Sequence, residues 1–161
     1  MSGTVAGKHG LMWMAFATTL AVFALTLGYF TSFEDASINI GIVDPAKDYL
    51  LGLGWSLVIL AAITVLPFSV QTKQVMLVLW IVRIAVTLGF MLFYEAHYGL
   101  DAFYYFSEGG AAYDHWANSG FGNGTDNIIA LSALHQTLIP GSYPALNVTC
   151  AAIGLASVYL F

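Results

Sequence analysis

The residue with the clearest chemical signal is Arg83, the only charged residue in the apolar run 75–94. It follows Lys73 by ten residues, which corresponds to about 15 Å along a helix. A charge at that depth in a bilayer is costly and is normally paired or placed in a cavity. A guanidinium binds phosphate through two parallel hydrogen bonds, so one interpretation is a lipid-phosphate anchor. The alternative is a side chain that snorkels to the membrane surface or pairs with a neighbouring helix.

A second set of chemically active side chains lies in the polar segment 95–127. If 101–117 is helical, one face carries two acids and two tyrosines at helical spacing: Asp101, Tyr104, Tyr105 and Glu108. Such a face could bind a sugar or a phosphorylated head group, or present a carboxylate as a base. Tyrosine, tryptophan and acids also gather at membrane surfaces without any chemistry. The sequence is compatible with a binding or catalytic face and with an ordinary membrane-surface segment.

The same segment contains the chain's main group of acidic and histidine side chains that could bind a metal. They are Glu95, His97, Asp101, Asp114 and His115. No HxxxH or HExxH spacing occurs among them, so no metal site is predicted. No cofactor can be identified from the residues either, although bound lipids are expected.

Smaller polar signals lie in the last third of the chain. His135 is interpreted as a polar contact beside Ser132 and Gln136. In the last apolar run, Asn147, Thr149 and Ser157 are predicted to form hydrogen bonds between helices. The single cysteine, Cys150, is predicted to be a small buried hydrophobic residue.

The elements that position these residues follow from the composition. The chain has 161 residues, of which 59% are hydrophobic and 8% are charged. Soluble domains are about 45–50% apolar and about 25% charged. Four apolar runs approach the roughly 20 residues that a helix needs to cross a bilayer: Leu11–Phe30, Tyr49–Val70, Val75–Tyr94 and Ala145–Phe161. The sequence therefore predicts an all-α integral membrane bundle of about four transmembrane helices, forming a single membrane domain over residues 1–161.

Two connections are predicted between these runs. Residues 71–74 would form a tight turn, which makes the second and third spans an antiparallel hairpin. The outer segment 95–144 contains a shorter apolar run, Ile128–Ile139, that ends at Pro140 and Gly141. This run is expected to be a re-entrant or interfacial helix. The alternative is that it joins the last span through a kink.

Charge predicts the orientation of the bundle. With the N-terminus in the cytoplasm, the inner side carries Lys8 and Lys73, and Arg83 lies in the half of its span nearer that side. Only Lys47 lies outside. This agrees with the excess of basic residues on cytoplasmic sides, and the acidic loops then fall outside. We expect a bacterial inner membrane. With only four Lys and Arg residues there is no basic patch, so nucleic-acid binding is excluded.

Part of the chain also resembles a known family. The stretch 99–106 (GLDAFYYF) resembles the first catalytic loop of polytopic GT-C-type membrane glycosyltransferases. The stretches 124–129 (GTDNII), 141–147 (GSYPALN) and 153–155 (IGL) are similar to polysaccharide-assembly members. The resemblance covers roughly residues 75–161 and implies that Asp101 is a base, that Tyr104 or Tyr105 contacts sugar or phosphate, and that Arg83 contacts a polyprenyl phosphate. The chain departs from the family where Ala102 follows Asp101, and in having fewer spans.

Two functions are therefore expected. The first is a non-catalytic accessory subunit of a larger membrane complex, for example an energy-converting complex, with lipids and other membrane subunits as partners. The alternative is a GT-C-type glycosyltransferase, or a truncated relative of one, that acts on polyprenyl-linked sugars.

Overall fold

The computed structural model describes residues 3–28, 44–98, 101–111, 124–139 and 141–160, and these ranges contain helices and no strand. This confirms the predicted all-α class. The helices are α1 (Gly3–Gly28), α3 (Pro45–Val65), α4 (Val70–Ala85), the π-helix η2 (Val86–Met91), α5 (Leu92–Tyr98), α6 (Asp101–Ala111), α7 (Gly124–Leu138) and α8 (Tyr143–Leu160).

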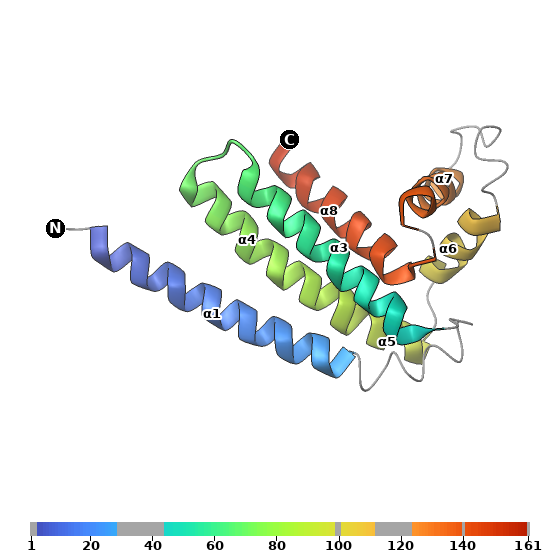
Figure 1. Ribbon diagram of the computed structural model, residues 1–161, viewed down its shortest axis with the longest axis horizontal. Coiled ribbons are helices and arrows are strands. Elements are labelled where there is room, and N and C mark those ends of the chain that lie inside the picture. Colours follow the sequence, from blue (N-terminus) through green and yellow to red (C-terminus); the bar gives the residue numbers. More distant parts are fainter. Residues whose placement is uncertain (1–2, 29–43, 99–100, 112–123, 140, 161) are drawn as a thin grey trace.

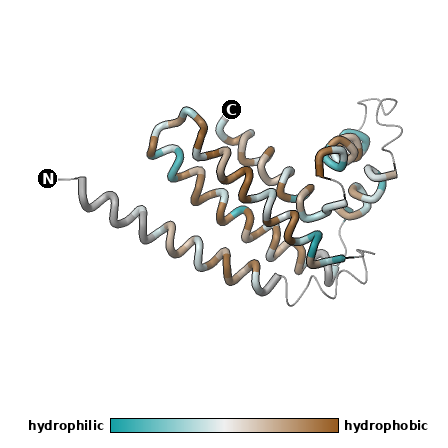
Figure 2. Tube along the Cα trace, in the orientation of Figure 1, coloured by the Kyte–Doolittle hydropathy of each residue, from teal (hydrophilic) through white to brown (hydrophobic). Residues whose placement is uncertain are grey.

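The long helices lie side by side, and the two short helices α6 and α7 lie together at one end of the bundle (Figure 1). Helices α1 and α4 run in one direction, whereas α3 and α8 run in the opposite direction (Figure 1). Helix α4 continues through η2 into α5. Hydrophobic residues predominate along α3, α4 and α8 (Figure 2), as expected for helices in contact with lipid.

Two helical segments are long and apolar enough to cross a membrane: Pro45–Val65, with 21 residues, and Val70–Tyr94, with 25 residues. At about 1.5 Å per residue, both exceed the roughly 30 Å of the hydrocarbon layer. Helices α7 and α8 pass the same test only as a pair, bent by 116°. In α1 the apolar stretch, Trp13–Thr26, is shorter. The described structure thus holds two spans, or up to three, and the predicted number of four is not confirmed.

The second span begins earlier than predicted, at Pro45 instead of Tyr49. The carboxylate of Asp44 accepts a hydrogen bond from the backbone N–H of Lys47 at 3.1 Å. Proline is favoured in the first turn because its missing N–H would have no helical partner. Capping therefore starts the helix four residues before the uncharged run begins.

The turn between α3 and α4 lies at residues 66–69, not at the predicted 71–74. Pro67 follows the end of α3, and Ser69 caps α4 by accepting a hydrogen bond from the N–H of Thr72 at 3.2 Å. The ammonium of Lys73 donates to the carbonyl of Thr64 at 2.8 Å, where the C-terminal end of α3 favours positive charge. The predicted antiparallel hairpin is present with a shifted turn.

The core lies between α3, α4, η2 and α8. Its largest fully buried side chains include Trp80, Tyr143, Leu88 and Leu92. The indole N–H of Trp80 donates to the carbonyl of Ser56 on α3 at 3.1 Å. A buried indole needs such a partner, so this bond fixes how α4 faces α3.

Helix α1 packs against α4 and η2 through small residues. Ala17, Ala21 and Ala24 are buried, and a Cβ at Gly89 would lie 2.8 Å from the carbonyl oxygen of Ala24. Small side chains let helix backbones approach closely in membranes. The hydroxyl of Tyr49 lies 3.2 Å from the carbonyl oxygen of Leu25 and 3.1 Å from that of Leu88. One side chain on α3 therefore links α1 to η2.

Helices α6 and α7 form a cap on the bundle. The amide of Gln136 on α7 donates to the carbonyl of Phe106 on α6 at 2.7 Å. A Cβ at Gly109 would meet the hydroxyl of Ser132, so these two helices touch closely. Helix α7 meets α8 at the 116° bend, where Gly141 has a φ of 71° that favours glycine.

Candidate functional site

A groove of about 700 Å³ lies between the α4–η2 segment and α8. Its walls are mostly apolar, and three polar side chains interrupt them: Arg83, Thr87 and Asn147. Thr87 lies one turn after Arg83 on the same face. The groove is open along one side, so its polar groups can meet a molecule from outside this chain.

The guanidinium of Arg83 reaches across the groove to α8. A Cβ at Gly154 would collide with its terminal nitrogen, so the guanidinium lies directly against the backbone of α8 at this glycine. Arg83 itself is half-buried. It lies thirteen residues after Val70 and eleven before Tyr94, about 20 Å and about 16 Å from the two ends of the span. The charge is therefore close to the middle of the helix.

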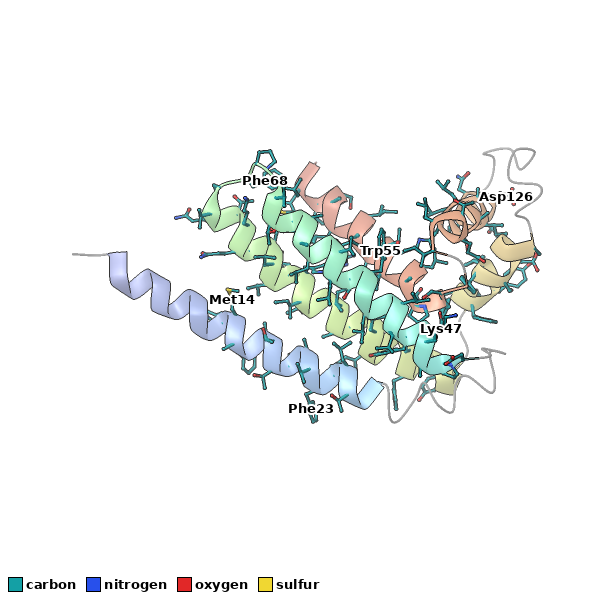
Figure 3. All side chains as sticks on the ribbon, viewed as in Figure 1. Met14, Phe23, Lys47, Trp55, Phe68 and Asp126 are labelled. Carbon is teal, nitrogen blue, oxygen red and sulfur yellow. The ribbon has the colours of Figure 1, made fainter. Side chains whose placement is uncertain are left out.

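Within the described part of the chain, no hydrogen bond or ion pair joins the side chains of Arg83, Thr87 and Asn147 to another residue. The described acidic side chains sit elsewhere, on the cap or at its junction with α3: Asp44, Asp48, Asp101, Glu108 and Asp126. Figure 3 shows Asp126 at the cap and Phe68 at the opposite end of the bundle. None of these five acids lines the groove around Arg83.

The predicted polar face of α6 is present but lies apart from the groove. Asp101, Tyr104 and Glu108 are exposed, and Tyr105 is half-buried. The rings of Tyr104 and Tyr105 meet edge to face with their centroids 5.8 Å apart. Helix α6 ends at Ala111, and the rest of the predicted helix 101–117 lies outside the described residues. The structure therefore places these side chains on the cap and Arg83 in the bundle.

The residues considered as metal ligands are only partly described. Asp114 and His115 lie outside the described residues, as do the side chains of Glu95 and His97. Among the side chains that the structure does describe, no group of three potential ligands comes together.

His135 makes a polar contact, and its partner is Thr149 on α8 instead of its neighbours Ser132 and Gln136. Its Nδ1 lies 3.1 Å from the hydroxyl of Thr149 on α8, and the indole N–H of Trp55 on α3 donates to the same hydroxyl at 2.8 Å. Ser132 and Gln136 instead bond to each other, at 3.2 Å. The 116° bend turns His135 toward α8, which no local spacing could indicate. The prediction for Thr149 is confirmed, and this network joins three helices.

Two buried polar atoms near the cap have no hydrogen-bond partner in the described structure: Nε2 of His135 and Oδ1 of Asp48. Asp48 is buried in the first turn of α3, and its backbone carbonyl accepts a hydrogen bond from the hydroxyl of Ser142 at 3.2 Å. Asp48 precedes the predicted run Tyr49–Val70, but it lies within α3 because the helix starts at Pro45.

Cys150 is exposed, not buried as predicted. It lines the groove, because it lies one turn from both Asn147 and Gly154 on the same face of α8. Apolar composition could not distinguish a core position from a groove position. Ser157, predicted to bond to another helix, donates within α8 to the carbonyl of Gly154 at 2.9 Å.

The sequence prediction also missed two residues beside Arg83. Thr87 could have been found as a polar residue one turn from an intramembrane charge. Gly154 carries no functional group, so nothing local in the sequence connects it to Arg83. Comparison of the chain with family models, with curated proteins and with solved structures gives no match.

Proposed function

We propose that this protein is a non-catalytic, multi-spanning subunit of a larger membrane complex. The observation that carries the proposal is the Arg83 groove. An arginine in the middle of a span is normally paired or placed in a cavity, and no acid of the described chain lies beside it in the groove. A second molecule in the groove would supply the counter-charge.

The outer surface of the bundle supports this role. Of the apolar part of α3, 28% is buried within the described structure. Some of the remaining residues, such as Leu53 and Ile59, are partly buried against the core, and the exposed ones would face lipid or another protein. Exposed leucine and valine side chains, such as Leu50, Leu57 and Val58, suit both kinds of neighbour, because helices associate in lipid through close packing.

The membrane is proposed to be a bacterial inner membrane, with the N-terminus in the cytoplasm. Helix α1 begins at the end of the bundle where α3 turns into α4 (Figure 1). Lys73 lies at that end, whereas the described acids gather near the cap. The excess of basic residues on cytoplasmic sides then places the cap outside.

Purification of the tagged protein from its native membrane in a mild detergent tests the subunit role. A partner should co-purify in a fixed ratio with the wild type and with Lys73→Gln, and it should be lost with Arg83→Gln. Both variants remove one basic charge, but only Arg83 lies in the groove. A wild-type protein that runs as a lone monomer contradicts the proposal.

A second candidate function rests on the exposed face of α6. Asp101 stands beside the paired rings of Tyr104 and Tyr105, on a helix outside the two long spans. In a GT-C-type glycosyltransferase acting on polyprenyl-linked sugars, Asp101 would act as base and the tyrosines would contact sugar. Arg83 would then contact the lipid phosphate.

Sugar transfer from polyprenyl-linked donors tests this alternative. Asp101→Asn should abolish transfer, because the amide cannot accept the proton, while Asp126→Asn, an exposed acid on α7, should leave it unchanged. Equal transfer by both variants, or none by the wild type, removes the alternative.

A further inference from the structure

We infer that the Arg83 groove seats one transmembrane helix of a partner subunit, and that this helix carries a single carboxylate near its middle. The inference rests on the proposed function and names the kind of partner. Its three elements are the depth of the charge, the length of the groove and the placement of the acids.

The depth of Arg83 favours a carboxylate on a helix over a lipid phosphate. Arg83 lies about 16–20 Å from either end of its span, and lipid phosphates lie at the edges of a hydrocarbon layer about 30 Å thick. To meet Arg83, a phosphate would have to enter the hydrocarbon by roughly half that thickness. An aspartate or glutamate on a crossing helix can lie at any depth, and the pairing removes two isolated charges at once.

The shape of the groove agrees with a helix as its occupant. Its wall on α4 and η2 runs from Leu79 to Met91, and its wall on α8 runs from Asn147 to Val158. Both walls therefore extend for about 16–18 Å along the bundle. A helix segment of that length and about 10 Å in diameter occupies roughly twice the 700 Å³ of the groove. The groove would hold one face of the helix, and the other face would meet lipid.

The chemistry inside the groove suits a carboxylate. A guanidinium donates two parallel hydrogen bonds to a carboxylate. The hydroxyl of Thr87 and the amide of Asn147 can donate to it as well, and neither is bonded to another described residue. The partner is inferred to be a different chain, because the acids that the structure describes in this one lie on the cap or at the junction with α3.

The test uses the full chain in phosphatidylcholine vesicles and a synthetic probe helix. The probe is a leucine–alanine helix of about 22 residues with one central glutamate, and the control peptide has glutamine in its place. Energy transfer measures association between a dye on the peptide and a dye on Gln71→Cys. The background is Cys150→Ala, because Cys150 lines the groove and alanine adds no hydrogen-bonding group there. Gln71 is exposed beside the α3–α4 turn, away from the groove.

We expect the glutamate peptide to associate at least tenfold more tightly than the glutamine peptide. Arg83→Gln should abolish this difference, and Lys73→Gln should keep it. Equal association of the two peptides, or a glutamate preference that survives Arg83→Gln, overturns the inference. Displacement of the peptide by added phosphatidylglycerol also overturns it, because the groove would then take an anionic lipid.

The peptide result is independent of the co-purification result. If partners co-purify but the glutamate peptide associates no more tightly than the glutamine peptide, the subunit role stands and the inference about the groove fails. If the peptide binds but the native protein runs as a lone monomer, the proposed subunit role fails while the groove's recognition of a buried carboxylate remains.

Discussion

Tyr49 connects three parts of the bundle through one hydroxyl, which lies within hydrogen-bonding distance of carbonyls on α1 and η2. The backbone in a π-helix departs from regular α-helical hydrogen bonding, and the C-terminal carbonyls of an α-helix lack helical partners. The single proton of the Tyr49 hydroxyl can be donated to either carbonyl or shared between them.

Tyr49→Phe should lower the free energy of unfolding by about 1 kcal/mol, because it removes the hydroxyl and keeps the ring. Unfolding of the detergent-solubilised protein by sodium dodecyl sulfate measures this change. Tyr104→Phe is the matched control: its hydroxyl is on the exposed face of α6, and its effect should stay within about 0.5 kcal/mol. Equal effects of the two substitutions would show that the hydroxyl of Tyr49 adds nothing.

The hydroxyl of Thr149 is shared by the side chains of Trp55 and His135. Thr149→Val keeps the shape of the side chain and leaves both ring nitrogens without this partner. We expect a loss of about 1–2 kcal/mol in the free energy of unfolding. Thr137→Val, at an exposed site on α7 where the hydroxyl bonds only to its own helix, should cost less. A larger loss from Thr137→Val than from Thr149→Val would contradict the role of the network.

At the scale of the helices, α1 is held by a close backbone contact. A Cβ at Gly89 would lie 2.8 Å from the carbonyl oxygen and 3.1 Å from the carbonyl carbon of Ala24. Because both atoms belong to a helix backbone, α1 would have to move. Gly89→Ala should therefore lower the free energy of unfolding by about 1–3 kcal/mol.

Gly54 on α3 provides the control for this prediction. A Cβ there meets nothing within 4 Å, so Gly54→Ala should be neutral or stabilising by up to about 1 kcal/mol, through the higher helix propensity of alanine. Similar stabilities for Gly89→Ala and Gly54→Ala would show that α1 does not pack closely against η2.

The helices themselves could largely be predicted from the sequence, because long uncharged runs become helices in lipid. Their boundaries could not, because capping sets where a helix starts. Asp44 caps α3 from before the predicted run Tyr49–Val70, and Ser69 caps α4 from inside that run. The π-helix η2 has no signal in composition. The sequence also could not indicate which face of each helix is buried, because residues that face lipid and residues in the core are equally apolar. Cys150 is an example: it was predicted to be buried and is exposed.

The candidate site could be predicted only in part, for the same reason. Arg83 stood out because a charge is rare in such a run. Its neighbours in the groove, Gly154 and Asn147, come from a helix more than sixty residues later in the chain. Only the packing of α8 against α4 and η2 brings them together. The face of α6, by contrast, is local, and helical spacing alone predicted it.

At the scale of the whole molecule, the charges divide the protein into two ends. Lys73 lies at the α3–α4 turn, and the described acids gather near the cap. Between them lie α3 and the α4–α5 segment, which are long enough to cross a bilayer. If these helices cross the membrane, the turn and the cap must face opposite compartments.

Labelling with a membrane-impermeant maleimide tests this arrangement most directly. The two labelling sites are exposed: Gln71→Cys beside the turn and Thr125→Cys on the cap. Each is made in a Cys150→Ser background, and the cells are converted to spheroplasts so that the reagent reaches the inner membrane. Thr125→Cys should label at once, whereas Gln71→Cys should label only after the inner membrane is permeabilised. Labelling of both cysteines from the same side would contradict a membrane-crossing bundle.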